Sequence, residues 1–403
     1  MIVVIADDLT GAAEMAGIAW RNGCQVGFLV VDERLGNNTR LRIKEARLRG
    51  IDVFVVATNC RSQNTTEAEH TILNVMEGIN ANEDILFKKT DSALRGHIVA
   101  EISVMLKTLG IKKSLLLPQN PSKKRTIEKG VFRICGVELH QTAFRFDPEY
   151  PISTSNVEEV LTGTRSLSIE EDLAEGINIA DASDANEVQL QLNKASTDTL
   201  IAGGADLFEA FLLQNSVINS FDNHLIHSNE ESGEEITELR RKSFPTERAR
   251  KPMLQLSEAC IVVCGSTQSK PFPLGFPVSL MPENVYHGAS AENWIQSACL
   301  EYSRSHTIVI GIGNHTEMIA QYANRLKETL SIVVCSLLDV FVPELIIIEG
   351  GATAYALLSR MEIRQIEVRA EIAPGVVCLS VMMASNNIDV IVKPGSYPWR
   401  VIQ

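Results

Sequence analysis

An excess of basic residues is absent from this 403-residue sequence, in which 37 lysines and arginines face 50 acids and the formal net charge is −13. Proteins that hold nucleic acid by its phosphates need a basic face, so we predict no nucleic-acid partner. Apolar runs of membrane-spanning length are also missing, which predicts no membrane partner. The first residues, MIVVIADD, carry no basic stretch before a short apolar run, so we interpret them as a strand and not as a signal peptide.

Paired cysteines and the common catalytic signatures are missing too. The eight cysteines are scattered, and the CxxxC of Cys260 and Cys264 has no second cysteine or histidine pair. We therefore predict no zinc site, and reduced, mostly buried thiols in a cytoplasmic protein. Neither a Walker GxxxxGK(S/T) motif nor a GxSxG motif occurs. GIGNHT at 311–316 lacks the third glycine of a dinucleotide fingerprint, which leaves an NAD(P)-dependent oxidoreductase as a remote alternative.

Composition and pattern indicate an α/β protein. Hydrophobic residues make up 45% and charged residues 22%, as in globular proteins, and the length favours two domains. Apolar runs alternate with helical patterns, which predicts parallel strands covered by helices on both faces. We predict two domains, each a largely parallel sheet flanked by helices, with a ligand cleft between them. The predicted strands are 2–5, 26–31, 53–58, 85–88, 114–117, 177–180, 200–202, 259–264, 307–312, 345–348 and 390–392.

The domain boundaries are predicted from shifts in composition. The first domain is expected at 1–215 and the second at 256–403, with a polar linker or insertion at 216–255. Proline and basic residues between 118 and 151 predict a functional excursion or flap within the first domain. In the second domain we expect helices at 317–330 and 353–361.

The first unusual loop, Asp7-Asp8-Leu9-Thr10-Gly11, joins the first predicted strand to a helix. In open α/β sheets, ligands bind at the carboxyl ends of strands, where adjacent carboxylates need a cation or hydrogen-bond donors nearby. Asp8 or Thr10 could simply cap the helix. In the functional interpretation, one carboxylate receives a substrate hydroxyl while the other is held by the cap.

The second loop, KKTDSALRGH at 88–97, also follows a predicted strand and precedes a helix. Arg95 could hold a carboxylate bidentately while Lys89 adds a compact charge. The alternative is a solvated basic turn with Asp91 as a helix cap. We favour a functional loop because its charges fall at a strand end and not along a helix face.

The third loop, EGGATA at 349–354, has two glycines that would let the backbone approach a ligand closely. Thr353 could cap the helix that begins there, and such a helix start suits phosphate oxygens. A tight turn that requires glycine explains the loop nearly as well. Gly265-Ser266-Thr267, after the predicted strand 259–264, is a similar but weaker candidate for a phosphate-binding loop.

Together these segments resemble the four-carbon acid sugar kinase family, which includes 3-oxo-tetronate, threonate and erythronate kinases. The resemblance spans almost the whole chain and is strongest in the first 150 residues. It rests on ADDLTGA (6–12), KKTDSALRG (88–96), RT (125–126), GV (130–131), GVELHQT (136–142), DP (147–148), LIAGGADL (200–207), VCGS (263–266), GGATA (350–354) and PGV (374–376).

The resemblance implies an N-terminal domain that holds the acid sugar, a C-terminal domain that holds ATP with Mg²⁺, and γ-phosphoryl transfer to a sugar hydroxyl between them. It implies catalytic roles for Asp8, Asp91 and Arg95, with Asp8 the favoured base. A homodimer is the default expectation. The implied substrate-binding residues are Asp7, Thr10, Lys89, Ser92 and Gly96; the implied nucleotide-binding residues are Ser266, Gly350, Gly351, Ala352, Thr353 and Gly395.

Three departures from the family pattern lie on the nucleotide side. Ala352 stands where the family usually has an acid, the closing motif becomes KPGSYPW at 393–399, and the prolines of 270–277 are incompatible with a normal helix. A second hypothesis is therefore a ligand-binding or regulatory relative that keeps the sugar-acid pocket but has lost efficient phosphoryl transfer.

Overall fold

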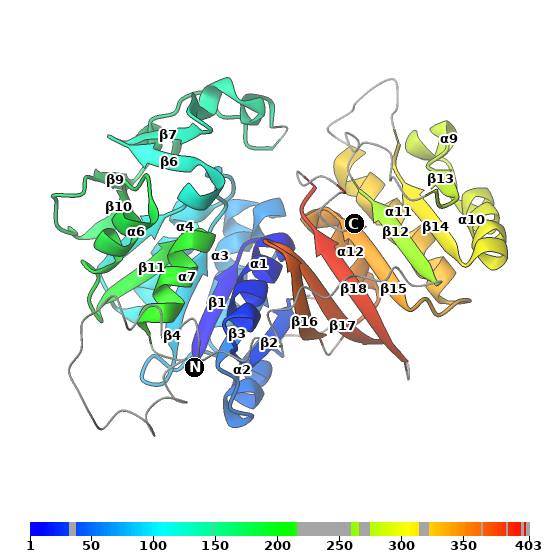
Figure 1. The fold of residues 1–403 in the computed structure, drawn as a ribbon, viewed down its shortest axis with the longest axis horizontal. Coiled ribbons are helices and arrows are strands. Elements are labelled where there is room, and N and C mark those ends of the chain that lie inside the picture. The colour runs from blue at the N-terminus through cyan, green and yellow to red at the C-terminus, as the bar shows by residue number, and fades with distance from the viewer. Residues whose placement is uncertain are drawn as a thin grey trace.

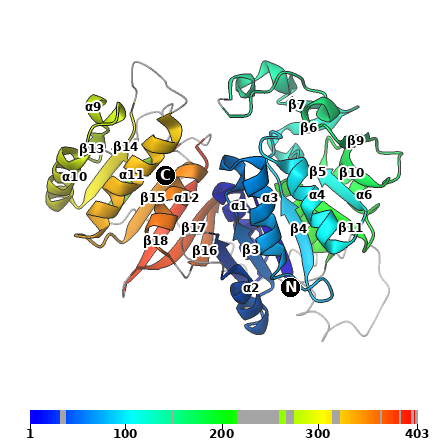
Figure 2. The same ribbon diagram turned by 180° about the vertical axis from the view of Figure 1, so that it is seen from behind.

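A computed structural model describes residues 1–31, 38–147, 149–215, 259–265, 275–313, 322–363, 366–383, 386–395 and 399. The described residues form an α/β protein whose two halves share one largely parallel sheet of fifteen strands, flanked by helices (Figure 1, Figure 2). The predicted fold class is confirmed. Among the described residues, no helix combines the length and apolar character needed to cross a membrane.

The N-terminal half contributes eight parallel strands in the order β2-β3-β1-β4-β11-β5-β10-β9. The strands are β1 Ile2–Ala6, β2 Val26–Val30, β3 Val53–Ala57, β4 Ile85–Lys89, β5 Lys113–Leu117, β9 Thr164–Leu167, β10 Gly176–Ala180 and β11 Thr199–Gly203. The helices are α1 Leu9–Arg21, α2 Thr39–Leu48, α3 Thr65–Met76, α4 Ile98–Leu109, α5 Val157–Val160, α6 Ala185–Leu192 and α7 Ala205–Gln214.

Strand β1 shows why this sheet is covered on both faces. All five of its residues are buried, and successive side chains of a strand point to opposite faces. Ile2 and Val4 pack in one apolar core with residues of α1 and α7. Val3 and Ile5 pack in a second core with residues of α3 and α4. The uninterrupted apolar run predicted this double burial.

The C-terminal half combines parallel and antiparallel strands. Strands β13, β14, β12, β15 and β18 are parallel in that order, and β17 and β16 continue the sheet in antiparallel fashion. The elements are β12 Cys260–Cys264, β13 Val278–Leu280, α9 Glu283–Tyr286, α10 Glu292–Ser305, β14 Thr307–Gly311, α11 Ala323–Leu338, β15 Leu345–Glu349, α12 Gly351–Arg360, β16 Ile366–Ala373, β17 Val376–Met383 and β18 Asn386–Lys393.

The junction of the halves differs from the prediction. Strand β16 pairs antiparallel with β2, where Ile366 lies opposite Phe28, so one continuous sheet replaces two separate ones. Strands β16 and β17 were not predicted. Strand β16 alternates polar and apolar residues, unlike the apolar runs that predicted the other strands, whereas β17 reads VVCLSVMM and is such a run. The helix expected at 317–330 is also corrected: α11 extends to Leu338. The predicted linker at 216–255 lies outside the described residues.

Helix α1 packs across this junction. It contacts β1, β2 and β3 of its own half, and β16, β17 and α12 of the C-terminal half (Figure 1). Its C-terminal Arg21 bonds to Glu371 of β16 and, at 2.9 Å, to Glu209 of α7. The turn that begins α1 is therefore held between the two halves.

The predicted flap is a small antiparallel sheet with short 3₁₀ turns, seen above the N-terminal half in Figure 1. Its strands are β6 Arg125–Glu128, β7 Val131–Ile134 and β8 Val137–Glu138; its turns are Pro121–Lys123, Leu139–Gln141 and Ala143–Phe146. The Tyr150 hydroxyl donates to the Arg61 carbonyl at 2.6 Å, and Arg95 bonds Asp147 at 3.2 Å. These contacts anchor the flap beside the loops that follow β3 and β4.

Candidate functional site

A cavity of about 870 Å³ lies where the loops after β1, β3 and β4 face the flap and the C-terminal half. This position, at the carboxyl ends of parallel strands, is where α/β proteins usually bind ligands. The residues that line it include Asp8, Thr10, Gly11, Glu14, Asn59, Arg61, Lys89, Asp91, Ser92 and Arg95 from the first half, Lys123, Arg125 and Phe144 from the flap, and Lys327, Gly351, Ala352, Pro374 and Gly395 from the second half.

Asp8 is both the cap of α1 and a wall of the cavity. One carboxylate oxygen accepts from the Gly11 N–H at 3.0 Å, and the other accepts from the Thr10 hydroxyl. The side chain nevertheless stays 16% exposed. Burial acts to raise the pKa of Asp8, but the charges of Arg61 and Lys89 outweigh it and hold that pKa below the ordinary value. Asp8 is therefore ionised at neutral pH and can accept a hydrogen bond.

Arg61 binds three carboxylates at the cavity floor and was not predicted. Its guanidinium lies 2.8 Å from Asp7, 3.0 Å from Asp8 and 3.3 Å from Asp91. Asp7 is 2% exposed and does not line the cavity. A signal for Arg61 existed in the sequence, because it follows the strand that pairs with β1.

Asp91 and Arg95 form a bidentate ion pair. Arg95 donates to both Asp91 oxygens at 2.9 Å, and Asp91 also accepts from the backbone N–H groups of Ala93 and Arg95. Burial opposes ionisation of Asp91, but Arg61 and Arg95 lower its pKa far below the usual range. The geometry makes Asp91 an anchor for two arginines, since its acceptor positions are already occupied.

Of the remaining residues predicted to bind substrate, two line the cavity and one lies outside its lining. Lys89 lines the cavity; its ammonium donates to the Thr90 carbonyl at 2.8 Å and lies 3.8 Å from Glu14. Ser92 also lines the cavity and accepts from Arg125. Gly96, with φ of 93°, lies outside the lining, and a Cβ there would lie 3.2 Å from the Asp7 carboxylate.

The opposite wall begins at α12. Gly350 precedes this helix with φ of 96°, and no side chain caps it. A Cβ on Gly351 would lie 3.0 Å from both Asp8 Oδ2 and Thr10 Oγ1. Glycine at 351 therefore permits a close approach between two loops that are far apart in the sequence.

Only some of the predicted nucleotide residues line the cavity. Gly351, Ala352 and Gly395 do, whereas Gly350 does not. Thr353 is 5% exposed, and its hydroxyl lies against Gly265, where a Cβ would come within 1.8 Å. Close packing therefore accounts for Gly265 and Thr353. Ser266 lies outside the described residues.

The cavity is cationic although the chain is acidic. Six cationic side chains line it against four carboxylates, which gives a net charge of +2; the cations are Arg61, Lys89, Arg95, Lys123, Arg125 and Lys327, and the acids are Asp8, Glu14, Asp91 and Glu149. A local positive potential in an otherwise negative protein favours an anionic ligand.

The residues fit a protein-built metal site poorly. Throughout the part of the chain that the structure describes, no group of three His, Cys, Asp or Glu side chains is arranged to hold a metal ion. Asp8 and Asp91 bond arginines, and Glu14 bonds Lys123. A Mg²⁺ ion that accompanies a nucleotide commonly keeps phosphate and water ligands.

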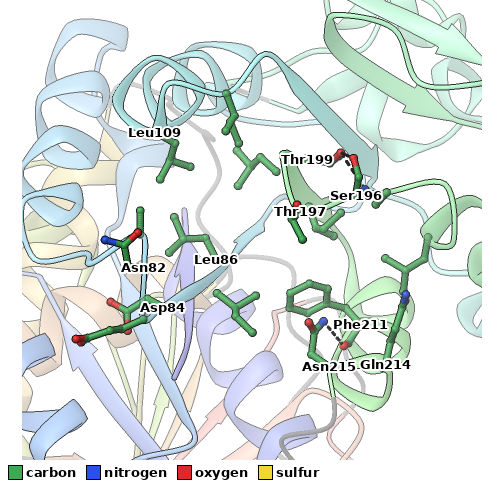
Figure 3. Close-up of a pocket in the computed structure, with 18 residues that line it drawn as sticks. Asn82, Asp84, Leu86, Leu109, Ser196, Thr197, Thr199, Phe211, Gln214 and Asn215 are labelled. Carbon is green, nitrogen blue, oxygen red and sulfur yellow. Dashed lines mark hydrogen bonds between the residues drawn. The ribbon is translucent and has the colours of Figure 1, made fainter.

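A second cavity, of about 720 Å³, lies at the amino ends of β4 and β11 (Figure 3). Its walls include apolar residues such as Leu86 and Phe211. Its polar groups are engaged locally: Asp84 bonds Arg47, and the Asn215 amide donates to the Phe211 carbonyl at 2.9 Å. Charged groups do not converge there as they do beside Asp8.

The glycines of the dinucleotide-like motif have a packing explanation. A Cβ on Gly311 would lie 3.3 Å from both Cys264 and Leu280, and one on Gly313 would lie 3.2 Å from Leu280. Neither glycine lines the cavity. The rest of the motif, 314–316, lies outside the described residues.

Comparison with known families finds two matches. Residues 2–206 match the model of a sugar-binding N-terminal domain, and residues 285–397 match that of a nucleotide-binding C-terminal domain. The first match covers half of the chain and contains the loops after β1, β3 and β4. The second contains α12 and Lys327.

Several curated proteins are similar over part of their length. A D-threonate kinase of Salmonella typhimurium is 25% identical, over 40% of this chain and 36% of that protein. A D-erythronate kinase of Heliobacterium modesticaldum is 28% identical, over 42% and 37%. A 3-oxo-tetronate kinase of Brucella melitensis is 27% identical, over 39% and 35%. The chain thus aligns with little more than a third of each relative.

Solved structures share the fold at full length. A Salmonella typhimurium LT2 protein superposes with a TM-score of 0.68 at 16% identity, covering 100% of this chain and 97% of that one. A Haemophilus influenzae protein of the DUF1537 family gives 0.61 at 15% identity, covering 100% and 99%. At these identities the likeness concerns the fold alone.

Proposed function

Because the chain belongs to the four-carbon acid sugar kinase family, whose two parts are a sugar-binding N-terminal domain and a nucleotide-binding C-terminal domain, we propose that it is a small-molecule kinase. Its reaction would transfer the γ-phosphoryl group of ATP to a hydroxyl of a four-carbon acid sugar. Residues 1–215 would hold the sugar and residues 256–403 the nucleotide. The names of the D-threonate, D-erythronate and 3-oxo-tetronate kinases support this substrate class.

The observation that carries the proposal is the close approach of Gly351 to Asp8 and Thr10. It brings the start of α12, a helix terminus suited to phosphate, beside a carboxylate that can accept a hydroxyl proton. The positive charge of the same cavity supports the binding of two anions, the acid sugar and the nucleotide. Phosphoryl transfer depends mainly on such positioning and charge neutralisation.

Asp8 would act as the base. The sugar hydroxyl oxygen forms a bond to the γ-phosphorus, its proton passes to the Asp8 carboxylate, and the bond between the γ-phosphorus and the β–γ bridging oxygen breaks to release ADP. Arg61 keeps Asp8 ionised and in place through its 3.0 Å contact. Asp91 would be a positioning residue, because its oxygens are occupied by Arg95 and Arg61.

The nucleotide side would combine backbone and charge. The N–H groups of Gly351 and Ala352 at the start of α12 are suited to phosphate oxygens. Lys327 of α11 adds an ammonium that lines the same cavity. An Mg²⁺ ion would arrive with ATP and neutralise phosphate charge. These features account for the departure at Ala352, because backbone contacts need no acidic side chain.

A coupled ADP-release screen tests the proposal. Purified protein would be assayed with Mg-ATP against D-threonate, D-erythronate, their enantiomers and 3-oxo-tetronates. We expect ADP release that depends on one of these acids. Release with none of them, from a folded protein that binds the acids, would favour the rival hypothesis of a ligand-binding relative without transfer.

A further inference from the structure

Arg125 differs from most other cations in the cavity because its side-chain partners are neutral groups and not carboxylates. It is the first residue of β6 in the flap, and its guanidinium donates to the Ser92 hydroxyl. The guanidinium carbon also lies 5.9 Å from the centre of the Phe144 ring. Both partners are neutral. Among the described carboxylates, none pairs with Arg125.

The neighbouring cations of the sugar side are already engaged. Arg61 bonds Asp7, Asp8 and Asp91. Lys123 bonds Glu14, and Lys89 donates to a backbone carbonyl while lying 3.8 Å from the same Glu14. Forming a new ion pair with any of these would compete with an existing contact.

Arg95, which the sequence predicts to hold the substrate carboxylate, is engaged as well. Both Asp91 oxygens and Asp147 accept from its guanidinium. The face of the group is covered by Phe144, whose ring centre is 5.2 Å away. Binding a substrate carboxylate there would mean breaking a bidentate pair that is largely buried, which is costly.

We propose that Arg125 binds the carboxylate of the substrate and sets the preference for an acid sugar over a neutral one. This inference rests on the proposed function. Arginine suits the role because its planar fork can donate two parallel hydrogen bonds to a carboxylate. The Ser92 contact and the Phe144 ring orient the guanidinium from the flap side. The acid end of the sugar then points to the flap, and its hydroxyls point to Asp8.

Direct binding, measured by calorimetry without nucleotide, tests this assignment. The ligands are D-threonate and D-erythronate, with the uncharged polyols D-threitol and erythritol for comparison. The variants are Arg125→Gln and a matched control, Arg145→Gln. Arg145 is also a flap arginine that lies over a phenylalanine, Phe146, at 5.7 Å, but it is exposed and outside the cavity.

Arg125→Gln should raise the Kd of an acid about tenfold or more, as expected for a lost charged hydrogen bond. It should leave polyol affinity and the thermal unfolding midpoint unchanged, and Arg145→Gln should bind like the wild type. Wild-type acid affinity in Arg125→Gln, or no acid binding by the wild type, would overturn the inference. Because no transfer is measured, Arg125-dependent binding without ADP release would refute only the kinase proposal.

Discussion

Asp8 is at once a helix cap and the proposed base, so a useful substitution must separate the two roles. Asn caps helices about as well as Asp but cannot accept a proton. Asp8→Asn should therefore lower kcat by about 100-fold or more, the usual range for general-base loss, with little change in KM. Steady-state kinetics would measure both constants.

Asp184→Asn supplies the control for Asp8→Asn. Asp184 caps α6 by accepting from the Glu187 N–H at 2.9 Å, in the same manner as Asp8 caps α1. It lies outside the cavity. This variant should keep wild-type kinetics. A mainly KM effect of Asp8→Asn would make Asp8 a binding residue.

Arg61 should determine the pH range over which Asp8 can work. Burial acts to raise the pKa of Asp8 and Arg61 to lower it, with a net value below the ordinary 3.8. The base is thus ionised throughout the neutral range, and activity is lost only as pH falls through that low pKa. In Arg61→Gln the opposing charge is gone, so the acid limb of kcat/KM should move up by about one pH unit or more.

Arg47→Gln is the matched control for the pH profile. Arg47 also pairs with a buried carboxylate, Asp84, but this pair lies at the amino end of β4 and outside the cavity lining. Its profile should follow the wild type. An unchanged acid limb in Arg61→Gln would show that Asp8 is not the group whose ionisation limits activity.

At single residues, the sequence could indicate Asp8 and Lys89 because each follows a predicted strand and begins a polar, glycine-containing segment. It could not show that Arg95 is also engaged by Asp147, because Asp147 belongs to a flap 52 residues further along the chain. Lys327 gave no local signal, because a lysine on an amphipathic helix is ordinary. Its position depends on how the two halves meet.

At the scale of elements, the contact between the start of α12 and the start of α1 leaves little room for a side chain at position 351. Gly351→Ala would place a methyl group 3.0 Å from Asp8 Oδ2 and Thr10 Oγ1. We expect kcat/KM to fall about tenfold, because a displacement of the base by a fraction of an ångström is costly for positioning. Thermal unfolding should change little. Wild-type kinetics would contradict the close approach.

Strand β4 and helix α4 are joined by a buried ion pair beneath the site. Lys88 and Glu101 are each 1% exposed and lie 2.7 Å apart. Lys88→Met would leave a buried carboxylate unpaired, and unfolding free energy should fall by about 3–5 kcal/mol. The double variant Lys88→Met/Glu101→Leu should lose less. Denaturant titration measures both, and a double variant that loses as much as Lys88→Met would show that the unpaired carboxylate is not the source of the loss.

The elements were predictable where one physical pattern was enough. Strands β1 and β3 of the first half are apolar throughout and follow the predicted ranges closely. Strand β9, which reads TRSL, carries no such apolar run and was not predicted. Strand β16 reads IEVRAEIA, with its buried positions separated by exposed or half-buried ones. That alternation is the pattern of a half-buried strand, and it differs from the apolar runs that predicted the other strands.

At the scale of the molecule, one continuous sheet replaces the two separate sheets that the sequence predicted. Pairing of β16 with β2 and packing of α1 over both halves place the loops after β1, β3 and β4 opposite α12. The domain boundaries at 215 and 256 and the homodimer stay predictions. The net charge of −13 belongs to the surface as a whole, whereas the cavity concentrates cations where two anions would meet.

The most direct test of the central claim is ³¹P nuclear magnetic resonance of the reaction mixture with Mg-ATP and each tetronate. The account predicts a new phosphate-ester resonance that grows as the γ-phosphate signal of ATP declines, with wild-type protein and not with Asp8→Asn. Loss of the γ-phosphate signal to inorganic phosphate alone, or no change with any four-carbon acid, would contradict it.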